Sequence, residues 1–63
     1  MARVAVSGVF VDVPDGCTIE TAMRDAGHIP DAFIYLIGGR PVPMDTEPPA
    51  ESEVKALRVA SGG

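Results

Sequence analysis

The sequence predicts an α+β fold in which a mixed sheet of four or five strands packs one face against a single helix. Two observations support this expectation. Apolar residues alternate with other residues near both ends of the chain, as in strands, and a stripe of apolar residues at helical spacing lies between them. With 63 residues the chain forms one domain at most, near the lower limit for unaided folding. We expect a folded domain over residues 1–60 and a flexible tail over 61–63.

The first two strands are expected to form a hairpin within the segment RVAVSGVFVDVPDG. Valines recur at alternate positions on both sides of Ser7-Gly8, which are typical residues of a tight turn. These valines are Val4, Val6, Val9, Val11 and Val13. The second strand is expected to end at Pro14-Asp15-Gly16, because proline, aspartate and glycine favour turns over sheet ladders.

The segment CTIETAMRDAG is expected to form the helix, about three turns long. Thr18 is a suitable N-cap, since its hydroxyl can accept a hydrogen bond from a free N–H group of the first turn. Glu20 in that turn suits the helix dipole, and Gly27 suits the left-handed position that ends a helix. One apolar stripe at helical spacing is formed by Ile19, Ala22, Met23 and Ala26.

The second half of the chain is expected to contribute two further strands. The segment AFIYLI is rich in β-branched and aromatic residues, GGRPVPMD turns the chain, and the prolines of TEPPAES indicate a loop. EVKALRVA then forms the last strand, with Leu57 and Val59 on one side and Ala56 and Arg58 on the other. The expected core consists of Val4, Val6, Val11, Val13, Ile19, Met23, Leu57 and Val59.

The order of these elements predicts a specific topology. The first and last strands are apolar enough to be central, although nearly the whole chain separates them. If they are parallel neighbours, the helix is the crossover that joins the first hairpin to the rest of the sheet. One helix can cover only one face of such a sheet. This arrangement is the β-grasp.

Composition excludes several classes of function. A single cysteine forms no internal disulfide, and one cysteine with one histidine cannot close a zinc site, so no bound metal is expected. The net charge of −4 argues against direct nucleic-acid binding. The longest apolar run has six residues, too few to span a membrane, and the N-terminus lacks the apolar region of a signal peptide. We expect a cytoplasmic monomer.

Three segments together resemble a known family. VPDGCTIETA resembles the strand-to-helix turn of ubiquitin-like β-grasp proteins, while GGRPVPMD and VKALRVASGG look like the turn and the tail of the small archaeal modifier proteins. The related sulfur carriers for thiamine and molybdopterin synthesis share a terminal Gly-Gly. The resemblance covers essentially the whole chain.

This resemblance implies that the C-terminal carboxylate of Gly63 is the reactive group. In the family an activating enzyme uses ATP to adenylate that carboxylate, which becomes a thiocarboxylate or joins a lysine of a target protein. Gly62 and Gly63 lack the side chains that would obstruct a narrow channel. The protein would then be the substrate, with no catalytic residue and no bound cofactor. Its partners would be the adenylating enzyme and either target proteins or sulfur-accepting enzymes. The sequence leaves open which route dominates.

Two other functions remain alternatives: a non-catalytic β-grasp interaction module, and a small subunit of a sulfur-transfer synthase of the molybdopterin or thiamine type. Autonomous catalysis is disfavoured because the sequence shows no acid–base pair or second layer that would form a cleft.

A docking surface is also expected. The residues alone do not fix which side of the third strand faces the core. Resemblance to ubiquitin implies that Tyr35 and Ile37 point inward and Leu36 outward, so that Leu36, Ala56 and Arg58 form an exposed patch that a partner could contact.

Other polar and reactive residues have structural interpretations. Cys17 is interpreted as a small apolar residue between helix and sheet, with a redox or thioester role as the alternative. His28 is interpreted as a loop residue. The spacing of Asp12, Asp15 and Asp25 matches no metal-binding loop, and these side chains are expected in water.

Overall fold

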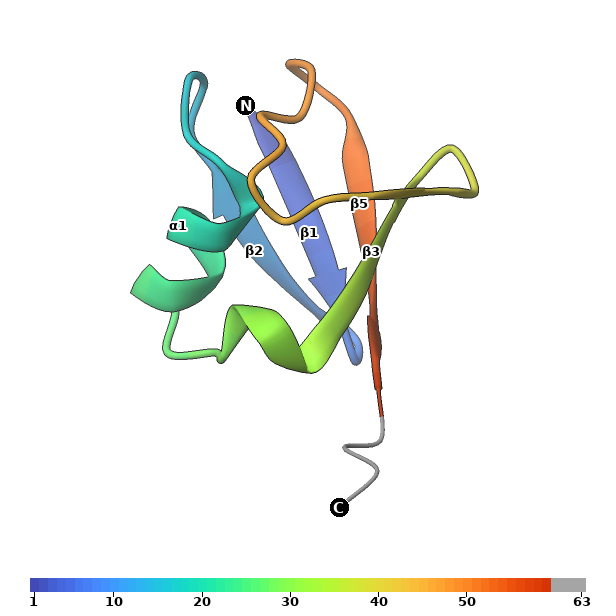
Figure 1. The fold of residues 1–63 in the computed structure, drawn as a ribbon. Coiled ribbons are helices and arrows are strands. Elements are labelled where there is room, and N and C mark those ends of the chain that lie inside the picture. Colours follow the sequence, from blue (N-terminus) through green and yellow to red (C-terminus); the bar gives the residue numbers. More distant parts are fainter. Residues whose placement is uncertain (60–63) are drawn as a thin grey trace.

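The computed structural model describes residues 1–59 and confirms an α+β architecture with a five-stranded mixed sheet and one α-helix (Figure 1). In chain order the elements are β1 (Ala2–Val6), β2 (Val9–Val13), α1 (Ile19–Asp25), the 3-10 turn η1 (Pro30–Ala32), β3 (Phe33–Ile37), β4 (Arg40–Val42) and β5 (Glu53–Arg58). Three features of the strands differ from expectation. Ala32 belongs to η1 instead of the third strand, the turn predicted after β3 contains the short strand β4, and β5 ends at Arg58, before Val59 of the predicted last strand.

The strand order is β2-β1-β5-β3-β4, so the first and last strands lie side by side in the centre of the sheet. β1 and β5 are parallel, with Val4 opposite Val54, and every other pair is antiparallel. The predicted adjacency of the first and last strands is therefore confirmed. Figure 1 shows α1 and η1 on one side of this sheet, between the first hairpin and β3.

The hairpin turn follows the sequence prediction. Ser7 and Gly8 both have positive φ angles, 48° and 85°, which is the backbone of a two-residue turn matched to the twist of the strands. Gly8 adopts this conformation without strain, because it has no Cβ atom. The turn sets Val6 opposite Val9, and this register fixes all the pairs between β1 and β2.

Both ends of α1 are set by local sequence. The Thr18 hydroxyl accepts a hydrogen bond of 3.1 Å from the Thr21 N–H, as expected of an N-cap. At the other end Gly27 has a φ of 88° and its N–H donates to the Arg24 carbonyl, while the His28 N–H donates to the Met23 carbonyl. These two bonds form a Schellman motif.

The helix is shorter than the expected three turns. It has seven residues, about two turns at 3.6 residues per turn. Ala26, the last residue of the apolar stripe, is the C-cap and is exposed. The other three residues of the stripe, Ile19, Ala22 and Met23, are buried.

The proline-rich loop between β4 and β5 completes the start of the helix. The Ile19 N–H donates to the Thr46 carbonyl (3.0 Å), and the Glu20 N–H donates to the Met44 carbonyl (2.8 Å). Together with Thr18, these carbonyls satisfy the first-turn N–H groups that a helix leaves without partners. The loop therefore holds α1 in place through backbone contacts.

The core lies between α1 and the face of the sheet that we call the helix side. The buried apolar residues are Ala2, Val4, Val6, Val11, Val13, Ile19, Ala22, Met23, Tyr35, Val54 and Ala56. The predicted core placement of Leu57 and Val59 was wrong, since these side chains are 43% and 36% exposed. Val54 and Ala56 take their place. A strand alternates sides at every residue, so an error of one position in the phase of β5 exchanges its two faces.

The phase of β3 agrees with the resemblance to ubiquitin. Tyr35 is buried, and Phe33 and Ile37 pack against the core, whereas Ile34 is exposed and Leu36 is half-buried. The predicted tail over 61–63, and the end of the predicted domain at residue 60, lie outside the residues that the structure describes.

Candidate functional site

The segment that leads to the expected reactive terminus is β5. This strand lies between β1 and β3, and it ends at Arg58. One residue later the Val59 N–H donates to the Ala32 carbonyl (3.0 Å), which ties the chain to the end of η1. Gly62 and Gly63, the expected activation and conjugation site, lie outside the described residues. The sheet thus fixes the chain up to four residues before Gly63.

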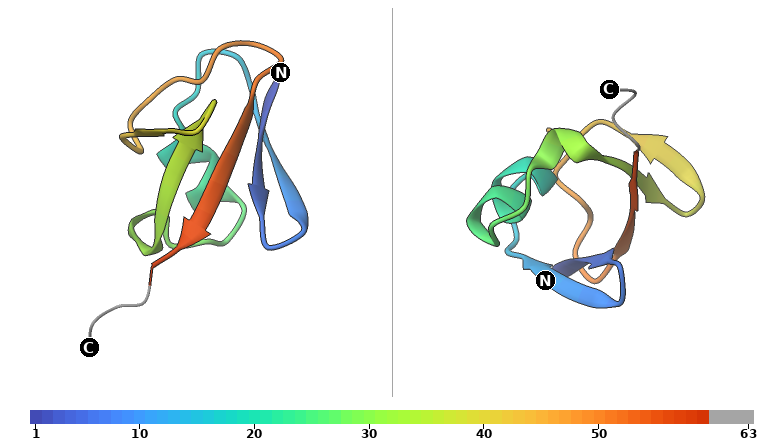
Figure 2. Two further views of the ribbon diagram at one scale, coloured as in Figure 1. Left: turned by 90° about the vertical axis from the view of Figure 1, so that its right-hand side faces the viewer. Right: turned by 90° about the horizontal axis from the view of Figure 1, so that it is seen from below.

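The sheet presents a second surface, which we call the open face, on the side away from α1. Across the five strands it consists of Arg3, Ala5, Phe10, Asp12, Ile34, Leu36, Pro41, Glu53, Lys55 and Leu57, as the strand registers require. Figure 2 (left) views the sheet from this side, and no helix of residues 1–59 crosses it.

Large apolar side chains are exposed at the centre of the open face. Leu57 lies opposite Ile34 on β3, and these side chains are 43% and 46% exposed. In the next row Lys55 lies between Ala5 and Leu36, and Phe10 follows beyond Ala5 with 54% of its surface exposed. An apolar surface surrounding one cation is suited to binding another macromolecule.

The structure corrects two members of the predicted docking patch. Leu36 lies on the open face as expected, whereas Arg58 is exposed at the end of β5 but projects to the other side of the sheet, in phase with Ala56. Ala56, however, is only 8% exposed and belongs to the core, opposite Tyr35. It cannot contact a partner together with Leu36, because the two side chains lie on opposite faces of the sheet.

Sequence reasoning missed Leu57, Ile34 and Phe10 as the exposed apolar residues. A usable signal was present in β5, where Glu53 and Lys55 are charged and alternate with Val54. Charged side chains on a half-buried strand mark its solvent side. Continuing that alternation by two residues places Leu57 on the same side as Lys55.

Charges divide the open face into two zones. At the start of β5, Arg3 pairs with Glu53 (3.1 Å between Nη2 and Oε1), and its guanidinium also lies 4.3 Å from the centre of the Phe10 ring. Toward the end of β5, Lys55 is exposed on the open face and Arg58 is exposed on the other side of the strand, and neither forms an ion pair within residues 1–59. A shallow groove of about 350 Å³ lies beside them, between Ser7-Gly8 and β5. The end of the strand that leads to the tail is therefore basic.

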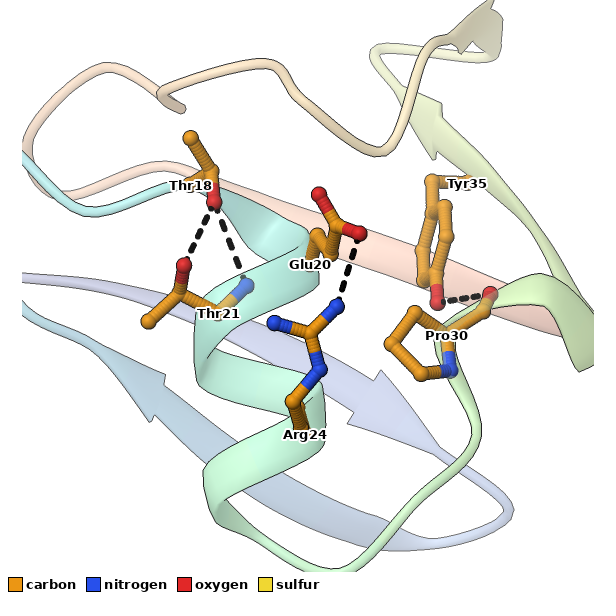
Figure 3. A network of polar contacts seen from close by, with 6 residues as sticks. All are labelled: Thr18, Glu20, Thr21, Arg24, Pro30 and Tyr35. Carbon is orange, nitrogen blue, oxygen red and sulfur yellow. Dashed lines mark hydrogen bonds and ion pairs between the residues drawn. The ribbon is translucent and has the colours of Figure 1, made fainter.

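The polar contacts on the helix side are structural (Figure 3). Arg24 pairs with Glu20 one turn away (2.8 Å), and the Tyr35 hydroxyl donates to the Pro30 carbonyl (2.7 Å). Burial raises the pKa of Tyr35, and the negative charges of Asp31 and Glu20 raise it further. Tyr35 therefore stays protonated and connects β3 to η1.

The other reactive or acidic residues considered as candidates have the structural positions expected for them. Cys17 is half-buried against the core, and His28 lies edge-on to the Phe33 ring with 6.0 Å between ring centres. Asp12, Asp15 and Asp25 are exposed. Within residues 1–59 no three histidine, cysteine, aspartate or glutamate side chains come together as metal ligands would.

No model of a known protein family matches the chain, and no curated protein matches it either. Among the helices of residues 1–59, none has the length and apolar character needed to cross a bilayer.

Proposed function

We propose that the protein is a ubiquitin-like modifier or sulfur carrier of the β-grasp type, activated at the carboxylate of Gly63. One observation carries this proposal: the strand that precedes Ser61-Gly62-Gly63 in the sequence is a central strand, parallel to β1 and directly beside it. That topology, with one helix on one face, supports a β-grasp, the fold in which such a tail is used.

The distance from the folded body to Gly63 suits this role. An extended chain spans at most about 3.6 Å per residue, so the four residues after Val59 reach about 14 Å. An enzyme that contacts the end of β5 can then hold Gly63 in a nearby nucleotide site. Glycine at positions 62 and 63 permits the backbone conformations that such a channel requires.

The proposed reaction uses the carboxylate as a nucleophile first and as an electrophile afterwards. The Gly63 carboxylate attacks the α-phosphorus of ATP and releases pyrophosphate, which gives an acyl-adenylate. A sulfur nucleophile or a lysine amine of a target then displaces AMP. The product is a thiocarboxylate when the nucleophile is hydrosulfide, and an isopeptide bond when it is a deprotonated lysine amine; AMP is the leaving group in both cases. The catalytic groups belong to the activating enzyme, and this protein is its substrate.

The open face is the proposed contact surface for the activating enzyme. Leu57 and Ile34 supply exposed apolar area and Lys55 supplies positive charge on this face, while Arg58 adds a second cation beside it at the end of β5. Apolar contact contributes affinity, and the two cations favour an acidic partner surface.

A second candidate is a stable subunit of a sulfur-transfer complex, or a non-catalytic interaction module. The exposed apolar centre of the open face favours it, because permanent partners cover such surfaces. This candidate predicts a stoichiometric partner on purification from the host.

The decisive experiment is ATP–pyrophosphate exchange with the activating enzyme of the host. We expect the intact chain to support exchange and a chain lacking Gly62 and Gly63 to support none. Thermal unfolding of both chains provides the control, and the midpoints should agree, since the deletion leaves every residue of α1 and of the five strands in place. Intact mass of the protein from its host should show a chain that ends at Gly63. Equal exchange by both chains would instead indicate an interaction module.

A further inference from the structure

The chain has one backbone anchor beyond the end of β5, at Val59. The Val59 N–H donates to the Ala32 carbonyl, with 3.0 Å between nitrogen and oxygen. Ala32 is the last residue of η1, so a segment outside the sheet holds the residue that follows the last strand. Four residues separate this anchor from Gly63 in the sequence. The segment η1 therefore fixes the position and direction of the chain shortly before the expected reactive residue.

The segment η1 depends on contacts from elsewhere for its own position. It is a single turn of three residues, closed by a bond of 3.0 Å from the Ala32 N–H to the Ile29 carbonyl, and none of its residues is buried. The Tyr35 hydroxyl donates to the Pro30 carbonyl (2.7 Å), and Figure 3 shows this side chain reaching from β3 to Pro30. Among the side-chain hydrogen bonds within residues 1–59, only this one reaches η1. Tyr35 therefore holds the segment that holds the end of β5.

Tyr35 is a rigid support for this contact. Its side chain is 3% exposed in the core, where close packing limits the movement of the ring, and it lies opposite Ala56 of β5. Two residues earlier on β3, Phe33 lies opposite Arg58, the last residue of β5. The strand that pairs with the end of β5 is thus the strand that carries the hydroxyl. Two connections, the ladder and η1, converge on Val59.

We propose that the Tyr35 hydroxyl and η1 form a guide, the η1 guide, that positions Val59 and thereby the approach of Gly63 to the activating enzyme. Tyr35 is a positioning residue in this role, because it acts through Pro30 and Ala32 and touches no reacting atom. The physical basis is conformational entropy, since a residue that is already fixed need not be ordered when the enzyme binds. This inference rests on the proposed activation of Gly63.

The test measures kcat and KM for the full chain as the protein substrate in ATP–pyrophosphate exchange. Val59→Pro removes the N–H and places a ring carbon against the Ala32 carbonyl, so the η1 guide loses its contact with the end of β5. We expect KM to rise at least about fivefold, because the enzyme must order one further residue, while kcat stays within about twofold. Val59→Ala is the matched conservative variant. It keeps the N–H, so KM should rise less than about twofold.

A second pair of variants separates positioning from stability. Tyr35→Phe removes the hydroxyl and should raise KM about two- to fivefold, since the η1 guide is loosened and not broken. Thr18→Ala removes the N-cap bond of α1, which causes a comparable loss of stability away from η1, and should leave KM unchanged. In the double variant Tyr35→Phe/Val59→Pro, KM should equal that of Val59→Pro alone, because the guide has then already lost its contact.

Hydrogen exchange measured by NMR tests the η1 guide in the free protein, without the enzyme. The Val59 amide should be protected in the wild type by its bond to the Ala32 carbonyl. Tyr35→Phe should increase its exchange rate at least about threefold. Thr18→Ala should leave that rate unchanged, because exchange at the end of the chain reports local opening and not unfolding of the whole domain.

Three results would overturn the proposal. These are equal KM values for the wild type and Val59→Pro, a further rise in KM when Tyr35→Phe is added to Val59→Pro, and an effect of Thr18→Ala on KM as large as that of Tyr35→Phe. Each of them leaves the wild type active, so the proposed function would stand. An intact chain that supports no exchange would instead contradict the proposed function, and the exchange rate of the Val59 amide would still decide whether Tyr35 holds the η1 guide.

Discussion

The two faces of the sheet are both apolar, yet only one is covered. On the helix side Val4, Val54 and Met23 are 0% exposed, whereas on the open face Phe10 and Ile34 are 54% and 46% exposed. A single helix of two turns cannot cover both faces of a five-stranded sheet. We propose a division of roles, in which the helix side supplies folding stability and the open face supplies surface for a partner.

The largest expected effect is a loss of folding stability, and it tests the two roles by truncating one side chain on each face. Met23→Ala deletes a fully buried side chain from the helix side and should lower the free energy of unfolding by about 2–5 kcal/mol. Domains of this size are stable by roughly 3–5 kcal/mol, so the variant should be largely unfolded. Urea titration followed by circular dichroism measures this. Leu57→Ala, the matched truncation on the open face, should cost less than about 1 kcal/mol. Equal losses for the two variants would remove the distinction between the faces.

Tyr35→Phe tests a smaller contribution on the helix side. Losing the hydrogen bond to the Pro30 carbonyl should cost about 0.5–1.5 kcal/mol. The pKa of Tyr35 is raised above its usual value near 10, so the folded state holds this proton more tightly than the unfolded state. Its contribution is therefore complete below pH 10 and is lost as the pH rises through the raised pKa.

Urea titrations of the wild type and Tyr35→Phe between pH 8 and pH 11 would measure that dependence. The stability of the wild type should fall more steeply than that of the variant above about pH 10. If the free energy of unfolding fell equally in both proteins above pH 10, Tyr35 would not be the cause of the loss of stability at alkaline pH.

Ile34 precedes Tyr35 on β3 and lies on the open face. Ile34→Asp should change the affinity for a partner and leave the stability nearly unchanged. It should leave the urea midpoint nearly unchanged, since changes at exposed sites usually stay within about 0.5 kcal/mol. A carboxylate among Leu57 and Leu36 should nevertheless reduce affinity for the activating enzyme about tenfold, measured by titration calorimetry, through a buried unpaired charge. Unchanged affinity would place the enzyme contact elsewhere than the open face.

The smallest effect is expected for Lys55→Arg, because this substitution keeps the positive charge on the open face. Lys55 is the only lysine in the sequence and is exposed on β5. Stability should be unaltered. We expect conjugates to be mostly single additions to other proteins, because position 55 lies within a strand between Ala5 and Leu36. Ladders of linked copies that persist in the variant, seen by immunoblot, would exclude Lys55 as their linkage site.

The sequence by itself determined the local features of the fold. Ser7-Gly8 sets the hairpin, Thr18 and Gly27 bound the helix, and the prolines between residues 41 and 49 exclude a central strand. These features depend on backbone conformations and short-range hydrogen bonds that a few neighbouring residues specify. The adjacency of the first and last strands was also predictable, because both are apolar and one helix lies between them.

Only the tertiary structure decided which residues of β5 are buried. The charges of Glu53 and Lys55 favour one phase of this strand and the apolar Leu57 and Val59 favour the other, and pairing with β1 and β3 places Val54 and Ala56 in the core while Leu57 remains exposed. The candidate docking surface was therefore predicted in part, since Leu36 lies half-buried on the open face while Ala56 and Arg58 project to the other side of β5. The capping of α1 by the carbonyls of Met44 and Thr46 was likewise invisible in the sequence. The physical reason is the same in both cases, since contacts between distant segments select among arrangements that local preferences leave nearly equal in free energy.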